Sequence, residues 1–435
     1  MSFQNFSLDE RLLNAVTDCG FTAPSDIQTQ AMPFQLEGRD IMASAPTGTG
    51  KTAAFVLPAL QRLLTNKAAE GHGPRVLVLT PTRELAAQVA KNIYELTKYA
   101  RMRSTSITGG TPYPPQIRSL KQPLDLLVAT PGRLIDHINS GRIDFSRLEV
   151  LVLDEADRML DMGFIDDVKR VVSLAPANRQ TILFSATLEG EIKKIARSIL
   201  NDPAKVQVAG VSCKHESIAQ SAHQADDFRH KRALLSHILN QNNVQQAIVF
   251  TATKRGADDL CSQLKEEGQS CAALHGDMKQ GQRRRTIDRL GRNQLRVLVA
   301  TDVAARGLDI KGISHVVNFD MPMQAEDYVH RIGRTGRGGA TGTAVSLIGP
   351  KDWGLLNAVE RLLESKLDIT EVVGLEPKLQ KPKSSSPNKR RSGSSRRGKP
   401  SIHYKRGGGS GNGNGNGSSG NQRRRRRSPR QLNAA

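Results

Sequence analysis

Cysteines and long apolar runs are scarce in this 435-residue chain, and each absence excludes a class of protein. The four cysteines (Cys19, Cys213, Cys261 and Cys271) are far apart and form no CxxC pair. This pattern argues against a zinc site or a disulfide framework and fits a reducing cytosol. No run of roughly 18 apolar residues occurs, so the sequence predicts no membrane span. The N-terminus lacks a basic segment followed by an apolar core, so we expect no secretory signal and a cytoplasmic protein.

Acidic residues are missing from the end of the chain. The last 58 residues contain 17 of the 63 Lys and Arg residues and no Asp or Glu, so the rest carries 46 basic and 42 acidic residues. The net charge of +21 is therefore mainly a property of the tail, and it predicts an anionic polymer as a partner. The tail is rich in Ser, Gly and Asn, includes the arginines Arg423 to Arg427, and cannot bury a core. We expect residues 371–435 to form a disordered basic tail that attracts this polymer, with solubilisation as the alternative.

Short apolar runs alternate with helical stretches in two successive blocks. This alternation predicts an α/β fold with two doubly wound parallel sheets, whose ligands bind at the carboxyl ends of the strands. We expect lobe one at residues 1–207, a linker at 208–224 and lobe two at 225–370. The expected strands are 75–80, 124–130, 149–154 and 180–185 in lobe one, and 246–251, 296–301, 315–319 and 343–347 in lobe two.

A glycine-rich segment, APTGTGKT, lies between an apolar run at 40–43 and a helical stretch at 53–64. Such a turn lets backbone N–H groups converge on phosphate oxygens at a helix N-terminus. Lys51 is expected to reach the β and γ phosphates of ATP, and Thr52 to hold Mg²⁺. The alternative is an ordinary glycine turn before a helix. The loop residues expected to bind the nucleotide are Ala45, Pro46, Thr47, Gly48, Thr49, Gly50, Lys51 and Thr52.

The tetrapeptide DEAD, residues 154–157, ends the apolar run VLVL. A carboxylate at a strand terminus beside a phosphate loop is suited to hold Mg²⁺, directly or through water, and we assign this role to Asp154. A second carboxylate, Glu155, can accept a proton from the attacking water. The alternative is an acidic start of a helix.

Together with motifs in a fixed order along the chain, these residues resemble the DEAD-box RNA helicases over roughly residues 3–365. The motifs that carry the resemblance are GF with Pro24, Ile27 and Gln28 before the phosphate loop, then PTRELA, GG, TPGR, DEAD, SAT, VFTATK, TDVAARGLDI and HRIGRTGR. The resemblance implies two tandem RecA-like lobes that hydrolyse ATP and locally unwind RNA duplexes. GGTPYPPQ after the GG motif departs from the usual pattern, which leaves the RNA contacts there open.

The resemblance also implies roles for individual residues. Gln28 would read the adenine edge, Phe21 would stack on the ring, and Asp309 would contact the ribose. Arg334 and Arg337 would be arginine fingers on the γ-phosphate, with solvated surface arginines as the alternative. The implied RNA contacts are Pro81, Arg83, Gly110, Thr130, Arg133, Arg283 and Thr301. Ser185, Thr187 and His330 would couple the two sites, although a lone histidine is by default a core residue.

Within the family the chain is similar to bacterial SrmB-type helicases, with RhlE-type helicases, which act in general RNA remodelling or decay, as the alternative. The SrmB-type resemblance implies a role in assembling the large ribosomal subunit, with its precursor RNA, and ribosomal proteins, as partners. Two other functions stay open. One is a DNA helicase or translocase on the same lobes, and the other is an ATP-independent RNA chaperone in which the tail binds RNA.

Overall fold

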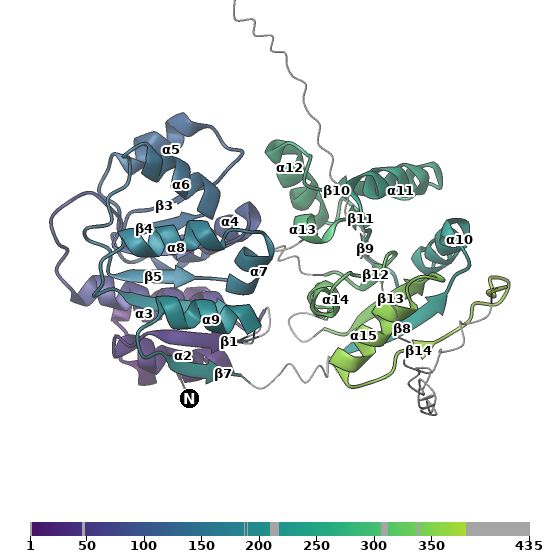
Figure 1. Cartoon of the computed structure of the whole chain (residues 1–435), viewed down its shortest axis with the longest axis horizontal. Coiled ribbons are helices and arrows are strands. Elements are labelled where there is room, and N and C mark those ends of the chain that lie inside the picture. Colours follow the sequence, from purple (N-terminus) through teal and green to yellow (C-terminus); the bar gives the residue numbers. More distant parts are fainter. Residues whose placement is uncertain are drawn as a thin grey trace, which may run out of the picture. The chain divides into compact units, whose positions relative to one another are not determined.

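The computed structural model describes residues 2–45, 48–186, 188, 190–208, 217–305, 312–336 and 340–379. The described part forms two α/β lobes (Figure 1). No helix in these ranges is long and apolar enough to span a membrane. Pro46, Thr47, Thr187, Asp309 and Arg337 lie outside the described residues, as does the chain beyond 379.

Lobe one contains seven parallel strands in the order β3-β4-β2-β5-β6-β1-β7. Its strands are β1 (Ile41–Ser44), β2 (Val76–Leu79), β3 (Ser104–Ile107), β4 (Leu126–Ala129), β5 (Val150–Leu153), β6 (Gln180–Ser185) and β7 (Ala204–Gln207). Its helices are η1 (Phe3–Phe6), α1 (Glu10–Asp18), α2 (Asp26–Leu36), α3 (Lys51–Thr65), α4 (Arg83–Leu96), α5 (Tyr113–Leu120), α6 (Pro131–Asn139), α7 (Ala156–Asp161), α8 (Ile165–Leu174) and α9 (Gly190–Ile199).

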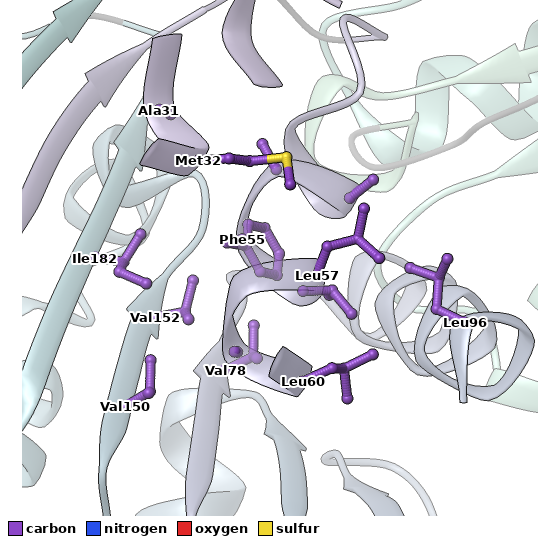
Figure 2. Close-up of a cluster of buried hydrophobic side chains, with 14 of the residues drawn as sticks. Ala31, Met32, Phe55, Leu57, Leu60, Val78, Leu96, Val150, Val152 and Ile182 are labelled. Atoms are coloured by element: carbon purple, nitrogen blue, oxygen red, sulfur yellow. The ribbon is translucent and has the colours of Figure 1, made fainter. Parts of the chain in front are cut away.

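The two faces of this sheet bury separate apolar clusters. Residues of α1 to α4 pack with Val78, Val152 and Ile182 on one face, and residues of α5 to α9 pack on the other. Figure 2 shows Phe55, on α3, among the side chains of the first cluster. Because successive strand residues point to opposite faces, strands buried on both faces are apolar throughout. This is why β2, β4 and β5 are plain apolar runs in the sequence.

Lobe two contains a second sheet of seven parallel strands, in the order β10-β11-β9-β12-β13-β8-β14. Its strands are β8 (Ile218–Gln224), β9 (Ala247–Phe250), β10 (Cys271–Leu274), β11 (Val297–Ala300), β12 (His315–Asn318), β13 (Gly342–Ile348) and β14 (Asp368–Ile369). Its helices are α10 (Phe228–Leu239), α11 (Lys254–Glu266), α12 (Gln280–Gly291), α13 (Asp302–Ala305), α14 (Ala325–Ile332) and α15 (Trp353–Leu363). Numbered from its own first strand, this sheet has the same order as the sheet of lobe one, so the two lobes share one topology.

The predicted fold class is confirmed, and every predicted apolar strand is present. The strands that the sequence did not reveal include all four sheet edges, β3, β7, β10 and β14. An edge strand has a neighbour on one side only, and these strands are short and partly exposed. They therefore lack the continuous apolar run that marks a central strand.

Two expected boundaries differ from the structure. The segment expected to be a linker, 208–224, contains β8, in which only Ile218 and Ala222 are buried, so that this strand resembles a loop in composition. The expected tail begins too early, because residues 368–379 pack on lobe two as a strap. In this strap β14 pairs with β8, Asp226 accepts hydrogen bonds from the backbone N–H groups of Lys378 and Leu379 at 2.9 Å each, and Val372 packs on the core.

Candidate functional site

The glycine-rich loop connects β1 to α3 at the carboxyl edge of the first sheet. Gly48 and Gly50 have positive φ angles of 83° and 86°, which L-residues rarely adopt, so the loop reverses direction at glycines. Lys51 is the first residue of α3, and its buried Nζ donates to the carbonyl oxygen of Ala45 at 3.0 Å. Thr52 follows it in the first turn of the helix. The Lys51 ammonium group thus connects the two ends of the loop, Ala45 and the start of α3, where a phosphate is expected to bind.

Gln28 lies on α2 and contacts this loop directly. Its Nε2 donates to the carbonyl oxygen of Gly50 at 3.0 Å, and its Oε1 accepts from the backbone N–H of Ser25 at 2.9 Å. A Cβ on Gly50 would lie 2.6 Å from Nε2, so any other residue there would have to displace the Gln28 amide. Phe21 is half exposed and stacks on the buried Phe3, with ring centroids 6.2 Å apart. Of the two adenine-motif residues, Gln28 thus contacts and supports the loop, while Phe21 packs on Phe3.

Three carboxylates follow β5 beside the loop. Asp154 is 3% exposed, and burial, opposed by Lys51 but reinforced by Glu155 and Asp157, raises its pKa to about 7. One carboxylate oxygen of each of the three residues is buried without a hydrogen-bond partner among the described residues. Glu155 also has a positive φ of 54°, a strained conformation for a residue other than glycine. Buried carboxylates that each keep one oxygen without a hydrogen bond, on a strained turn, form a site that a cation would stabilise.

The third acidic residue connects DEAD to the segment after β6. Asp157 Oδ2 accepts a hydrogen bond from the backbone N–H of Ala186 at 3.2 Å, and burial raises the pKa of Asp157. Ser185, the last residue of β6, is fully buried, and Ser44 Oγ donates to the carbonyl oxygen of Ala186 at 2.9 Å. A shift of the acidic turn would therefore be transmitted directly to the SAT segment.

Basic residues of α14 and its C-terminal turn form a cluster in lobe two. Arg334 is 6% exposed, and its Nε donates to the carbonyl oxygen of His330, one turn earlier. Arg331 is more deeply buried and forms a bidentate pair with Asp302, at 2.6 and 2.8 Å. Asp327 of the same helix lies 3.7 Å from Arg158 Nη1 of lobe one. These contacts bring the arginine cluster and the DEAD turn to neighbouring positions.

Arginines also gather at the carboxyl ends of β2 and β4. The Arg83 guanidinium packs against the GG turn, where a Cβ on Gly110 would lie 1.9 Å from Nη1. Burial is the main cause that lowers the pKa of Arg83, and the charges of Arg283 and Arg133 lower it further. Thr130 is the N-cap residue of α6, and Pro81 is buried just before α4. The cluster has the positive charge and the backbone turns that suit a phosphate chain.

Arg283 does not point freely into this cluster. Its Nε and Nη2 contact Oε1 of Glu84 in lobe one at 2.8 and 2.7 Å, and its Nη1 donates to the carbonyl oxygen of His275. Its Nη2 also donates to the carbonyl oxygen of Ala304 at 3.3 Å. Thr301, the residue that follows β11, is buried. Arg283 is thus bound by protein groups of both lobes rather than left available to a ligand.

Each lobe matches a known family of helicase domains. Residues 25–195 match the DEAD/DEAH box helicase family, and residues 229–339 match the helicase conserved C-terminal domain. The ATP-dependent RNA helicase SrmB of Escherichia coli is 45% identical over 382 residues, which are 88% of this chain and 86% of that protein. The chain is a DEAD-box ATP-dependent RNA helicase. The SrmB protein of Haemophilus influenzae is similarly related, at 44% identity over 88% of this chain and 87% of its own length.

Solved structures agree with this assignment. Saccharomyces cerevisiae Dbp5 bound to RNA and ADP BeF3 matches with a TM-score of 0.78 and 32% identity, over 85% of the helicase and 95% of that chain. Mss116p bound to single-stranded RNA and AMP-PNP matches with a TM-score of 0.76 and 31% identity, over 86% of the helicase and 80% of that chain. Both neighbours hold a nucleotide and RNA on the fold that this helicase shares.

The residues of the nucleotide site fit a magnesium ion. Within the described residues no group of three acidic, His or Cys side chains could hold a metal alone. Mg²⁺ bound to a nucleotide needs only one or two protein ligands, because phosphates and water supply the rest. Asp154, with one buried oxygen that lacks a hydrogen-bond partner, and Thr52 in the first turn of α3 suit this role.

Some residues of the helicase site were not singled out from the sequence. Glu84, Arg158, Asp302, Asp327 and Arg331 form the contacts described above, yet only Glu84, Asp302 and Arg331 lie within quoted motifs. Charged residues are common on helices, and only the folded chain reveals that these are buried and paired. The sequence could have pointed to Arg331, because HRIGRTGR carries more basic residues than two arginine fingers require.

Proposed function

We propose that the helicase binds ATP and Mg²⁺ on lobe one and completes its catalytic site with Arg334 and Arg337 of lobe two. The observation that carries this proposal is the convergence, beside the loop between β1 and α3, of Lys51 and three carboxylates that each have one buried oxygen without a hydrogen-bond partner among the described residues. The contact between Arg158 and Asp327 supports the approach of the α14 cluster to the same turn.

In this proposal each residue has a distinct task. Lys51 leaves the carbonyl oxygen of Ala45 and binds the β and γ phosphates, while Thr52 and Asp154 hold Mg²⁺, which neutralises phosphate charge when bound. Glu155 accepts a proton from the attacking water, and its strained turn fixes the direction of the carboxylate. Arg334 and Arg337 stabilise the charge that develops on the γ-phosphate. Phe21 and Gln28 select adenine, and Asp309 contacts the ribose.

The test of this site is Arg337→Ala. An arginine finger typically contributes about 10³ to 10⁵ in rate, so we expect RNA-stimulated turnover to fall by about that factor while ATP affinity changes little. Turnover is measured by phosphate release, and affinity by titration with a fluorescent ATP analogue. Arg361→Ala, on the exposed side of α15, is the matched control. Normal turnover in Arg337→Ala would contradict the completed site.

We further propose that RNA lies along Arg83, Gly110, Thr130 and Arg133 of lobe one and near Thr301 of lobe two. Contacts of this kind reach phosphates and 2′-OH groups and not base edges, which selects RNA without reading its sequence. Ser185, Thr187 and His330 would couple the two sites. ATPase stimulation by RNA, compared with DNA of the same sequence, tests this selectivity. Equal stimulation would favour a DNA helicase or translocase.

The cellular role that we propose is cytoplasmic assembly of the large ribosomal subunit, on its precursor RNA and close to ribosomal proteins. The support is the resemblance to SrmB-type helicases in both motifs and overall identity. The test is crosslinking and sequencing of RNA in cells that carry Glu155→Gln, which slows hydrolysis and prolongs the RNA complex. Enrichment of discrete large-subunit RNA segments supports the role. Reads spread over messenger RNA would favour general remodelling or decay, as in RhlE-type helicases.

An ATP-independent RNA chaperone is the remaining alternative. The intact Lys51, Asp154 and Glu155 argue against it, since a chaperone would not need a buried acidic turn beside a phosphate loop. Lys51→Ala separates the two functions in a duplex-unwinding assay. Unwinding that persists in this variant without ATP would favour the chaperone.

A further inference from the structure

The Arg133 side chain is enclosed by groups of the GGTPYPPQ segment, which departs from the usual family pattern. Its guanidinium carbon lies 4.0 Å from the centre of the Tyr113 ring, and its Nη1 donates to the carbonyl oxygen of Thr111 at 2.9 Å. The side chain is 9% exposed, and its Nε is buried without a hydrogen-bond partner among the described residues. The Tyr113 ring thus covers one face of the guanidinium, and the Thr111 carbonyl oxygen binds Nη1. The Nε donor has no hydrogen-bond partner among the described residues.

A nearby carboxylate could neutralise this arginine, but it is already engaged. Asp136 lies one turn further along α6, and its Oδ2 is 3.5 Å from Arg133 Nε, too far for a good hydrogen bond. The same oxygen accepts the hydroxyl proton of Tyr113 at 2.9 Å. Tyr113 therefore contacts Arg133 with its ring and Asp136 with its hydroxyl.

The surroundings of Arg133 favour an anionic ligand. Arg83 and Arg133 are close enough for the charge of Arg133 to lower the pKa of Arg83, and the GG turn lies between these two side chains. Within the described residues, Asp136 is the acidic group that lies within ion-pair distance of Arg133. A buried guanidinium with an unpaired donor gains much more from a phosphate than an exposed one does.

We propose that Tyr113 is a positioning residue that fixes Arg133 for an RNA phosphate and keeps the 3.5 Å ion pair between Asp136 and Arg133 from closing into a hydrogen-bonded one. This inference rests on the proposed RNA role of Arg133. The ring restricts the guanidinium to one orientation, and the hydroxyl holds the carboxylate away from Nε. The segment GGTPYPPQ thus supports RNA binding through a side-chain arrangement of its own.

The two contacts of Tyr113 can be separated by mutation. Tyr113→Phe keeps the ring and removes the hydroxyl, so Asp136 becomes free to move closer to Arg133 Nε, hydrogen-bond to it and compete with the phosphate. We expect RNA affinity to fall about three- to tenfold, and the double variant Tyr113→Phe with Asp136→Asn to recover it to within about twofold. Tyr113→Leu also removes the aromatic face, so we expect a loss of about tenfold that Asp136→Asn does not restore.

The measurement is fluorescence anisotropy of a labelled single-stranded RNA in the presence of a non-hydrolysable ATP analogue. ATP turnover at saturating RNA is the second readout, and we expect it to stay within about twofold of the wild type, because Tyr113 acts on RNA affinity. A general structural defect would instead lower the unfolding midpoint and turnover together. Tyr94→Phe is the matched control, since Tyr94 is 76% exposed on α4 of the same lobe.

The RNA affinities of these variants decide whether Tyr113 positions Arg133. Recovery of affinity in the double variant supports the proposal. Unchanged affinity in Tyr113→Phe overturns it and would fit a ring that stacks on an RNA base, because phenylalanine stacks equally well. Arg133→Ala distinguishes failure of the proposal from failure of the RNA site: a loss of affinity in that variant leaves the site standing, and unchanged affinity removes it.

Discussion

The contact between Gln28 and Gly50 links the adenine motif to the phosphate loop through a single hydrogen bond of 3.0 Å. Gly50 has a positive φ of 86° and no room for a Cβ beside the Gln28 amide. Residues that are 22 positions apart in the sequence therefore constrain each other. We therefore expect nucleotide binding to depend on this glycine, for its backbone conformation and for its close approach to Gln28.

We expect Gly50→Ala to weaken ATP binding by at least about tenfold. The left-handed conformation costs an L-residue about 1 to 2 kcal/mol, and the new methyl group also displaces the Gln28 amide. Titration with a fluorescent ATP analogue measures the loss. Gly354→Ala on α15 is the control, because nothing lies within 4 Å of the added Cβ there. ATP affinity that is the same in both variants would contradict this role of Gly50.

The sequence singles out residues where chemistry restricts the residue type, and it misses residues whose contacts depend on burial; the roles assigned to the site residues stay predictions. Lys51, Asp154 and Glu155 stand out because a glycine loop and an acidic strand end are rare combinations. Asp157 and Tyr113 did not stand out, because a hydrogen bond to Ala186 or a ring beneath Arg133 leaves no mark in the sequence. Arg283 was expected to contact RNA, a role that stays a prediction. The structure binds its guanidinium to Glu84 and two carbonyl oxygens.

At the scale of elements, the pair between Arg331 and Asp302 connects α14 to the first residue of α13, just beyond β11. Arg331 also donates to Asn318 Oδ1 at 3.1 Å, and its guanidinium carbon lies 5.0 Å from the centre of the Phe250 ring. The helix that carries His330 and precedes Arg334 is thus attached to three strand ends by one side chain.

We expect Arg331→Ala to lower the free energy of unfolding of lobe two by about 3 to 5 kcal/mol, since it leaves Asp302 without its partner. Urea unfolding followed by circular dichroism measures this loss. Arg361→Ala, on an exposed position of α15, is expected to change stability by less than about 0.5 kcal/mol. A loss below about 1 kcal/mol in Arg331→Ala would mean that the pair does not hold α14.

His315 begins β12 and is 3% exposed, and burial lowers its pKa. The unfolded chain therefore takes up a proton near pH 6.5 that the folded chain does not, so stability is lost as pH falls below about 6.5. We expect the wild type to lose up to about 1.4 kcal/mol per pH unit more than His315→Asn does. Thermal unfolding between pH 7 and 5 measures the difference, with His237→Asn, exposed on α10, as the control. Parallel pH profiles for wild type and His315→Asn would contradict this.

How well each strand could be predicted from the sequence depended on its burial. Central strands are buried on both faces and appear as apolar runs, so β2, β4, β5, β9, β11 and β12 were predicted close to their observed bounds. Edge strands such as β3, with the sequence STSI, and β7, with AKVQ, alternate or expose their side chains. These strands pair through backbone hydrogen bonds to a neighbouring strand. The pattern of side chains in the sequence does not show which strand that neighbour is.

At the scale of the whole molecule, Glu84 and Arg283 join the lobes through a largely buried ion pair, with side chains 12% and 8% exposed. Arg83 Nη1 and Gln280 Oε1 lie 3.3 Å apart beside it. The PTRELA motif of lobe one thus contacts α12 of lobe two directly. This pair is a candidate link between lobe closure and RNA binding.

We expect Glu84→Arg and Arg283→Glu each to lower RNA-stimulated turnover by about tenfold or more, because each places like charges together. The double variant restores the pair in reverse and is expected to recover part of the loss, with a coupling free energy of about 1 to 3 kcal/mol. Phosphate release at saturating RNA measures turnover. If Arg283 acts instead by contacting RNA, the double variant will be no better than Arg283→Glu alone.

The basic tail contributes sequence-independent affinity in our interpretation. If the arginines at 423–427 neutralise about five phosphates of single-stranded RNA, the logarithm of affinity falls with the logarithm of salt with a slope of about −3.5. Removal of residues 380–435 should reduce the steepness of the salt dependence by that amount and leave turnover at saturating RNA unchanged. RNA titrations between 50 and 200 mM salt measure it, and an unaltered slope would assign the tail to solubility.

The common strand order of the two lobes has a consequence for their ancestry. Strand β8 occupies in lobe two the position that β1 occupies in lobe one, so residues after Gln224 correspond to the phosphate loop. There the chain reads Ala225, Asp226, Asp227, which would repel a phosphate. Asp226 instead accepts the backbone N–H groups of Lys378 and Leu379 from the strap. If the lobes arose by duplication, the second copy replaced the backbone N–H donors of a phosphate loop with carboxylate acceptors. The position of the ancestral ligand site then binds the strap, residues 368–379, of the same chain.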